Sequence, residues 1–294
     1  MTDRKLIKPQ TLEEALAERE RYGRDALPIA GGQSLLVLLR NKLIDPTVLI
    51  DLEPIGDLRG LDGRGKDFSI GAMTTIDTLA SSPEVRQRFS VLGEAAKKVG
   101  STAIRNLGTI GGNVCHNEPG ADLPPALLTL NAKVELRSRS GSKKLELSDF
   151  FRGYFETAVK ADELLVKIEI PQQPAGARGV YLKHAISPED LAIVSASVVV
   201  VPDGQQGKAG AVRIGLGGVA PVPFRARKAE ESLAGVTLDD KAIREAAELA
   251  ATEAEPMTDP HGSAQYRRKM VKVLVRRALT ALREDSKRSG NGKA

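Results

Sequence analysis

The sequence predicts an α+β protein with two domains. Its 294 residues are enough for two domains that each bury a core of their own. A stretch rich in glutamine, proline and glycine, residues 172–177, is the best candidate for the linker between them. Beyond it, predicted strands come first and predicted helices follow, an order typical of an antiparallel sheet with helices packed on it. We therefore expect a first domain over 1–175, an α+β domain over 178–285 and a basic tail at 286–294.

Short strands and short helices alternate in the first domain. Thr11 is the predicted N-cap of a helix that runs to Arg21, and Glu14 three residues later completes a capping box. The other expected elements are strands at 26–29, 48–51, 68–71 and 164–170, a hairpin of 133–137 with 144–147, and helices at 34–40, 74–80, 85–99 in two pieces and 126–130. A polar segment before Lys66 suggests two lobes, at about 1–58 and 59–175.

The second domain is expected to contain strands at 180–184, 193–201 and 211–216 and helices at 226–233, 239–253 and 263–283. Residues 215–220 fit the G-x-G-x-x-A pattern of dinucleotide-binding Rossmann folds. That pattern requires the loop to open a helix. Here Pro221 and Pro223 follow at once and force an extended path. We therefore expect a structural role for these glycines, and a change at Gly217 should leave ligand content largely intact.

Composition excludes several classes of function. The net charge is +5, but residues 267–294 carry ten basic and two acidic side chains, so the remainder is slightly acidic and unlike a nucleic-acid binder. No apolar run is long enough for a membrane span, and the N-terminus lacks the apolar core of a signal peptide. One cysteine and three separated histidines predict no metal site and no disulfide. We expect a cytoplasmic protein.

Two glycine motifs stand out. Ala30-Gly31-Gly32-Gln33-Ser34, the first glycine motif, lies between a predicted strand and a predicted helix. Thr109-Ile110-Gly111-Gly112-Asn113, the second glycine motif, is predicted to be a similar loop. Successive backbone N–H groups in such loops form a concavity that binds phosphate, and a helix N-terminus adds its dipole. Two loops of this kind suit the two halves of a pyrophosphate, so a bulky residue at Gly32 or at Gly112 should weaken ligand binding.

Three segments carry a family resemblance: residues 30–36 (AGGQSLL), 104–113 (IRNLGTIGGN) and 121–126 (ADLPPA). In this order they resemble the FAD-binding medium subunits of molybdenum hydroxylases, which include the flavoproteins of aerobic carbon monoxide dehydrogenase and the matching part of xanthine dehydrogenase. The resemblance implies a two-lobed FAD-binding domain of the vanillyl-alcohol-oxidase-like (PCMH) type followed by a C-terminal α+β domain. It also implies an iron–sulfur small subunit and a molybdopterin large subunit as partners, in a heterotrimer that passes electrons through FAD to an external acceptor.

The resemblance also implies the cofactor-binding residues. They are Pro28, Ile29, Ala30, Gly31, Gly32, Gln33, Ser34, Leu35, Thr109, Ile110, Gly111, Gly112, Asn113, Asp122, Leu165 and Lys183. Lys183 matches a lysine that approaches the pyrimidine end of the flavin, and Leu165 matches an apolar residue that packs on the cofactor. Asp122 is expected to accept a hydrogen bond from a cofactor hydroxyl, although capping of the following helix explains it equally well.

The remaining candidates are not expected to be catalytic, because the resemblance implies that the flavin itself carries out the chemistry. Cys115 and His116 are adjacent and lack a third, orienting group, so we expect no catalytic residue in this chain. Arg105 is equally compatible with a phosphate contact and with a salt bridge. The alternative function is a stand-alone FAD oxidase of a small alcohol, which would require more aromatic and acid–base residues in the second domain.

Overall fold

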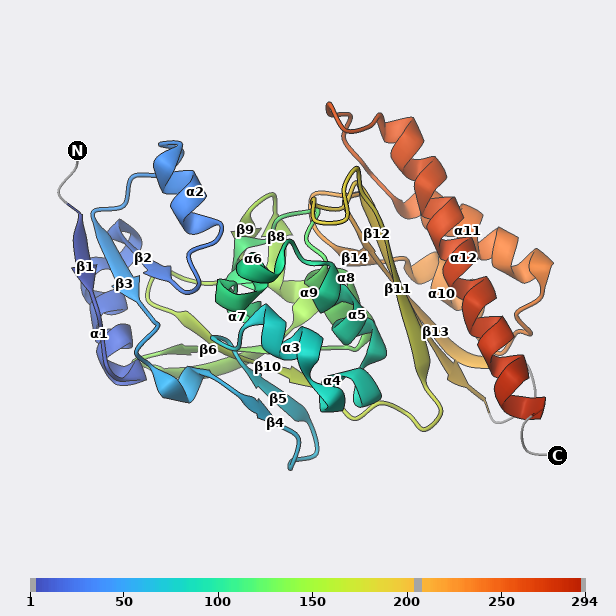
Figure 1. Cartoon of the computed structure of the whole chain (residues 1–294), viewed down its shortest axis with the longest axis horizontal. Coiled ribbons are helices and arrows are strands. Elements are labelled where there is room, and N and C mark those ends of the chain that lie inside the picture. The colour runs from blue at the N-terminus through green and yellow to red at the C-terminus, as the bar shows by residue number, and fades with distance from the viewer. Residues whose placement is uncertain (1–3, 204–207, 292–294) are drawn as a thin grey trace. The chain divides into compact units, whose positions relative to one another are not determined.

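The computed structural model describes residues 4–203 and 208–291, and Figure 1 shows the order of its elements. The chain forms two compact units, each built from several segments. The first unit comprises residues 1–78, 101–117 and 131–172, and the second comprises 79–100, 118–130 and 173–294. The predicted linker falls in the loop between β10 and β11, but two earlier segments also belong to the second unit. The domain boundaries given above stay a prediction.

The first unit begins with a small parallel sheet in the order β1 (Lys5–Ile7), β3 (Val48–Asp51), β2 (Ala26–Ile29). Helix α1 (Leu12–Tyr22) packs on it through an apolar core. The predicted cap is confirmed, because Thr11 Oγ1 accepts the N–H of Glu14 at 3.2 Å. The Glu14 carboxylate accepts from the backbone of Gln10, one residue before the cap. The capping box is therefore displaced by one residue.

A larger antiparallel sheet completes the first unit in the order β4 (Leu61–Asp62), β5 (Phe68–Gly71), β10 (Leu164–Ile170), β6 (Lys133–Ser138), β7 (Gly141–Glu146). The predicted hairpin is confirmed as β6 and β7. The other elements are η1 (Gly23–Asp25), α2 (Leu35–Arg40), η2 (Gly56–Leu58), α6 (Thr102–Leu107), α7 (Ile110–His116), α9 (Leu147–Phe150), and the paired strands β8 (Phe151–Gly153) and β9 (Glu156–Thr157). Helix α3 (Ile76–Ser81) runs across the division between the units.

The second unit is a four-stranded antiparallel sheet covered on both faces. Its strand order is β11 (Arg178–His184), β12 (Val194–Pro202), β13 (Ala209–Gly217), β14 (Phe224–Arg225). Helices α10 (Arg227–Ser232), α11 (Asp240–Glu253) and α12 (Ala264–Asn291) pack on one face, and α5 (Ser90–Lys98) and α8 (Leu123–Thr129) on the other (Figure 1). Helix α4 (Pro83–Arg88) precedes α5.

The side chains of β12 point alternately to the two faces of the sheet, so the strand packs against different helices on each face. Val194, Ala196 and Val198 belong to the apolar core with α11 and α12. Ser197, one residue out of phase, points to the other face and bonds Thr129 of α8 at 2.8 Å. Small residues let α8 approach this face closely. A Cβ at Gly215 would lie 2.3 Å from the carbonyl oxygen of Pro125.

The 215–220 glycine run is part of this sheet and opens no helix. Gly215 and Gly217 lie within β13, which is antiparallel to β12. The rejection of a Rossmann site is therefore confirmed. A Cβ at Gly217 would lie 2.6 Å from Ser195 Oγ and 2.8 Å from a Pro125 side-chain carbon, so alanine there disturbs the packing of α8 on the sheet.

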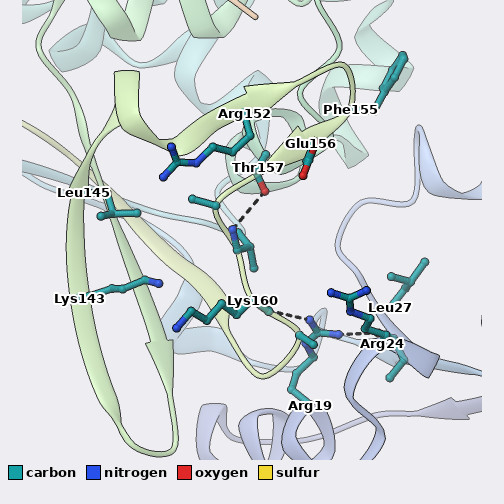
Figure 2. Close-up of a pocket in the computed structure, with 14 residues that line it drawn as sticks. Arg19, Arg24, Leu27, Lys143, Leu145, Arg152, Phe155, Glu156, Thr157 and Lys160 are labelled. Carbon is teal, nitrogen blue, oxygen red and sulfur yellow. Dashed lines mark hydrogen bonds between the residues drawn. The ribbon is translucent and has the colours of Figure 1, made fainter.

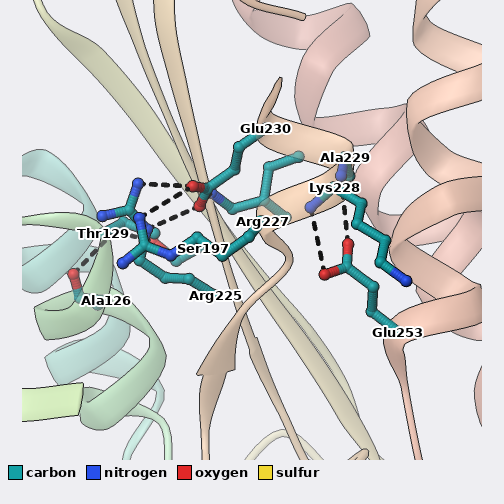
Figure 3. Close-up of polar contacts among 10 residues, drawn as sticks. Ala126, Thr129, Ser197, Arg225, Arg227, Lys228, Ala229, Glu230 and Glu253 are labelled. Atoms are coloured by element: carbon teal, nitrogen blue, oxygen red, sulfur yellow. Dashed lines mark hydrogen bonds and ion pairs between the residues drawn. The ribbon is translucent and has the colours of Figure 1, made fainter. Parts of the chain in front are cut away.

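A buried carboxylate joins α10 to the sheet (Figure 3). Glu230 accepts the N–H of Ile214 at 2.8 Å and a bidentate pair of bonds from Arg225, each 2.7 Å long. Burial, with Arg225 close by, lowers the pKa of the neighbouring Arg213 to about 10. Glu253 caps α10 by accepting two backbone N–H groups. The carboxylates of Glu230 and Glu253 are thus both bonded within the chain, so this cluster has a structural role.

Helix α12 continues past the predicted end at Arg283 and includes 286–291 of the predicted basic tail. Residues 292–294 lie outside the described part of the chain. None of the helices in the described ranges has the length and apolarity that a membrane crossing requires.

Candidate functional site

The first glycine motif is an open cradle of backbone donors. It connects the end of β2 to the start of α2. Within the described residues, the N–H groups of 31–34 donate to no other group. Gly32 has φ +71, in the left-handed region that favours glycine, and its carbonyl accepts the N–H of Leu36 at 3.0 Å. Gln33 Nε2 closes the turn by donating to the Gly31 carbonyl at 3.1 Å. Such a row of unbonded N–H groups at a helix start is suited to an anion.

The second glycine motif is not a loop, and in this respect the sequence prediction is wrong. Thr109 is the N-cap of α7, and its Oγ1 accepts the N–H of Gly112 at 3.1 Å. The N–H of Ile110 donates to the carbonyl of Thr74 at 3.0 Å, and that of Gly111 to the carbonyl of Ala72 at 2.8 Å. These donors are already used by the chain. The predicted row of phosphate-binding N–H groups is therefore absent from 110–112 of the described structure.

The two motifs nevertheless lie together. A Cβ built on Gly112 would be 3.6 Å from Cβ of Ala30. A Cβ on Gly31 would be only 1.8 Å from the carbonyl oxygen of Leu107, at the end of α6. Beside them, Asn113 Oδ1 is buried and has no hydrogen-bond partner in the described structure. A buried acceptor without a partner is costly, so it marks a place for a ligand donor.

Asp122 and Lys183 are brought together in the second unit. Lys183 Nζ lies 2.9 Å from Asp122 Oδ2 and also donates to the carbonyl of Lys98 at 2.8 Å. Tyr181, which sequence reasoning missed, donates its hydroxyl to Asp122 Oδ1 at 2.6 Å. Tyr181 and Lys183 are two residues apart on β11, so their side chains point to the same face of the strand. This spacing is the feature of the sequence that could have indicated Tyr181. Asp122 is the N-cap residue of α8 by position, but its side chain makes no capping hydrogen bond and is bonded to Tyr181 and Lys183 instead.

This cluster is almost sealed from water, since the Lys183 and Asp122 side chains are 4 % and 3 % exposed. Burial raises the pKa of Asp122 to about 6, although Lys183 and Tyr181 partly offset it. Burial and the neighbouring carboxylate raise the pKa of Tyr181 well above its usual value. Asp122 therefore changes protonation near neutral pH.

A basic pocket opens in the first unit (Figure 2). Its volume is about 1070 Å³, and residues of β2, β7 and the β8–β9 segment line it. Arg24, Arg152 and Lys160 line it without an acidic partner among the described residues, and Glu156 contributes one carboxylate. Lys143 is ion-paired with Glu163 at 2.7 Å. The pocket therefore has an uncompensated positive charge.

Hydrogen bonds hold the segments around this pocket in place. Arg19 is buried and donates to the carbonyls of Ala26 at 2.5 Å and Lys160 at 3.3 Å, and burial lowers its pKa. The side chain of Asn117 donates to the carbonyls of Gly153 and Glu156, which fixes the β8–β9 hairpin to the end of α7.

The remaining candidates make contacts within the described chain. Leu165 is buried in β10 opposite Leu136. Arg105 pairs with Asp77 at 3.6 Å, which is the salt-bridge alternative. Burial raises the pKa of the Cys115 thiol to about 12, so the thiolate that a nucleophile requires is scarce at neutral pH.

Comparison with known proteins decides the family. Residues 2–173 match the family model described as the FAD binding domain in molybdopterin dehydrogenase, and 180–282 match the CO dehydrogenase flavoprotein C-terminal domain. The chain is 37 % identical to the carbon monoxide dehydrogenase medium chain of Afipia carboxidovorans, over 92 % of this chain and 94 % of that one. It therefore belongs to the FAD-binding medium chains of the carbon monoxide and xanthine dehydrogenase type.

Two further matches show the same similarity over nearly the whole chain. The glyceraldehyde dehydrogenase medium chain of Sulfolobus acidocaldarius is 33 % identical, over 93 % of this chain and 96 % of that one. A solved structure of carbon monoxide dehydrogenase from Hydrogenophaga pseudoflava matches with a TM-score of 0.91 and 36 % identity, over 95 % and 96 % of the two chains. The predicted fold class is confirmed.

FAD is the cofactor of this family, and the first unit fits it. The unbonded N–H groups of the first glycine motif suit phosphate oxygens, and the unpartnered Oδ1 of Asn113 suits a hydroxyl donor. The medium chain is thus the flavoprotein component of a molybdenum dehydrogenase.

Proposed function

We propose that this medium chain receives electrons from iron–sulfur clusters on a small subunit and delivers them to an external acceptor, within a heterotrimer completed by a molybdopterin large subunit. The cradle of unbonded N–H groups at the first glycine motif is the observation that carries the proposal. The single cysteine cannot hold a cluster, so the clusters belong to a partner. Bound FAD supplies the redox chemistry, since it takes up two electrons and releases them singly or in pairs.

In this proposal, the protein binds and orients the cofactor. The N–H groups of Gly31 and Gly32 bind its pyrophosphate, and the left-handed backbone at Gly32 holds the turn open. Asn113 Oδ1 accepts a hydrogen bond from a cofactor hydroxyl. The second glycine motif acts through this side chain, because its glycine N–H groups are bonded elsewhere.

We further propose that the basic pocket receives part of the ADP half of FAD. Leu27, which lines it, directly precedes the predicted ligand residue Pro28 on β2. The segment from Lys160 leads into β10, where the predicted ligand residue Leu165 lies. The unpaired cations around the pocket would offset phosphate charge.

The parts assigned to Asp122 and Lys183 rest on the family resemblance and stay a prediction. Within the second unit, Tyr181 and Lys183 hold the Asp122 carboxylate from both of its oxygens. We propose a cytoplasmic location, on the sequence alone. The alternative, a stand-alone alcohol oxidase, has no support from the relatives named above, which are chains of multi-subunit dehydrogenases.

Expression with and without the two proposed partner chains tests the function. The isolated chain should bind FAD at about one per chain and should not be reduced by organic substrates. In the three-chain complex, the flavin absorbance should bleach when the molybdenum subunit's substrate is added without air. Robust turnover of an alcohol by the isolated chain would support the oxidase instead.

A further inference from the structure

Helix α2 carries an unusual apolar surface. Its sequence is LLVLLR, yet none of its residues is buried. Leu36 is 46 % exposed, Val37 51 % and, just beyond the helix, Leu43 68 %. An amphipathic helix normally buries its apolar side chains against its own protein. A cluster of exposed large apolar residues therefore marks a contact surface.

Helix α6 adds to this surface. Ile104 is 40 % exposed and Leu107 58 %, and α6 has no buried residue either. The first glycine motif connects the two helices, because Gly31 packs against the carbonyl of Leu107 at the end of α6 and α2 begins four residues after Gly31. Leu36, Val37, Leu43, Ile104 and Leu107 form what we call the α2–α6 surface.

Basic side chains border the α2–α6 surface at the end of α2. Arg40 and Lys42 are exposed and have no acidic partner in the described structure. The backbone here is defined by hydrogen bonds: Lys42 has φ 56, and the N–H of Leu43 bonds the carbonyl of Leu38 at 2.9 Å. That is the bonding of a helix C-cap, in a conformation that lysine adopts at a cost. The backbone that carries Arg40, Lys42 and Leu43 is therefore held by hydrogen bonds at the end of α2.

We propose that the α2–α6 surface docks the iron–sulfur partner through a partner face that is apolar at its centre and acidic at its rim. The inference rests on the proposed function. Electron transfer between bound groups falls off steeply with distance, so the donor must dock close to the residues that hold FAD, here those of the first glycine motif, which is proposed to bind its pyrophosphate. Helices α2 and α6 flank those residues, and Arg40 and Lys42 complement acidic side chains. Apolar residues at the centre of an interface contribute most of its binding energy.

Charge substitutions on exposed residues test this docking without disturbing the core. We would combine Leu36→Glu with Val37→Glu and use Leu6→Glu, 52 % exposed on β1, as the matched control. A second pair combines Arg40→Glu with Lys42→Glu, with the exposed Lys66→Glu as its control. Each chain is co-expressed with both partner chains and purified through a tag on this chain. Native mass spectrometry gives the subunit stoichiometry, and absorbance gives the flavin content.

The apolar double variant should keep its flavin but bind the iron–sulfur chain ~30-fold or more weakly, as loss of a central contact does. The charge variant should weaken the same contact, and more so at low salt. Both controls should match the wild type.

Three results would overturn the docking proposal. They are retention of the iron–sulfur chain at wild-type stoichiometry, selective loss of the molybdenum chain, and an equal loss with Leu6→Glu. Flavin loss with the apolar pair would also overturn it, by assigning the surface to the cofactor. A wild-type chain without flavin would instead contradict the proposed function.

Discussion

The two glycine motifs look alike in sequence and differ in what their backbones do. In the first, the N–H groups of 31–34 are unbonded within the described chain. In the second, the N–H groups of Ile110, Gly111 and Gly112 are bonded to Thr74, Ala72 and Thr109. A pair of glycines is therefore no proof of a phosphate-binding loop. The hydrogen-bond partners of the N–H groups decide the role.

The glycines of the two motifs also differ in the reason why glycine is required. Gly32 is required by its positive φ, and its Cβ would meet side-chain atoms alone, the nearest being the flexible end of Leu36 at 3.0 Å. Gly31 and Gly111 are required by packing, because a Cβ would collide with the backbone at Leu107 and at Ala72. Each motif thus contains a glycine that keeps two chain segments close together, and the first also contains one that shapes the ligand cradle.

The largest effect is expected from Gly31→Ala. Its Cβ would lie 1.8 Å from a carbonyl oxygen, so either the first motif or α6 must move. We expect a loss of more than about 4 kcal/mol in the free energy of unfolding and no retained flavin, measured by denaturant unfolding and by absorbance. Gly56→Ala is the control, because its Cβ meets open space. A stable, flavin-loaded Gly31→Ala chain would contradict the packing role.

The second unit contains polar groups that, unlike the N–H groups of the first glycine motif, are hydrogen-bonded within the chain, and Asp122 is one of them. The pKa of Asp122 is raised to about 6, so its protonated form is the one favoured by folding. The resulting stabilisation is fully present below about pH 4 and is lost as the pH rises through 6. Relative to Asp122→Asn, the wild type should lose roughly 2 to 3 kcal/mol between pH 4 and 7. The exposed Asp149→Asn is the control, and parallel pH profiles of wild type and Asp122→Asn would refute the assignment.

Gly32→Ala and Gly112→Ala compare the motifs directly. The sequence predicts that bulk at either position weakens FAD binding. The structure predicts a difference, because only Gly32 combines a positive φ with unbonded neighbouring N–H groups. We expect the FAD Kd to rise about tenfold for Gly32→Ala, the cost of a non-glycine residue in that conformation, and less than about threefold for Gly112→Ala. Fluorescence titration of the flavin-free chains measures both, and a larger effect at Gly112 would reverse our assignment.

The smallest effect concerns Asn113. Its Oδ1 is buried without a partner, so Asn113→Leu should stabilise the flavin-free chain by about 1 kcal/mol and weaken FAD binding about fivefold. Thermal unfolding with and without FAD separates the two changes. Asn117→Ala is the matched contrast, since the Asn117 amide already donates to two carbonyls and its loss should destabilise both forms. A less stable flavin-free Asn113→Leu chain would show that this oxygen has a partner within the protein.

The sequence predicts the elements well where one local signal decides them. The helix after Thr11 follows from its cap, and β12 from its long apolar run. The fold class and the cofactor follow from the motifs that carry the resemblance. These features depend on neighbours along the chain, which a sequence displays.

The features that sequence reasoning missed depend on contacts between distant segments. Thr109 turns the second motif into a helix start only because Ala72 and Thr74 supply acceptors from another segment. Tyr181 reaches Asp122 across 59 positions of the chain. Gly217 packs directly against Pro125 of α8, a contact that its place in the sequence does not indicate. No local pattern reveals such a partner.

Hydrogen–deuterium exchange of the chain with and without FAD tests the contrast between the motifs most directly. Peptides that cover 30–35 should exchange quickly in the flavin-free chain and become protected when FAD binds, because their N–H groups then gain phosphate acceptors. Peptides that cover 110–113 should be protected in both states, since their N–H groups are bonded within the protein. Equal gains of protection at both motifs, or no gain at the first, would contradict the account.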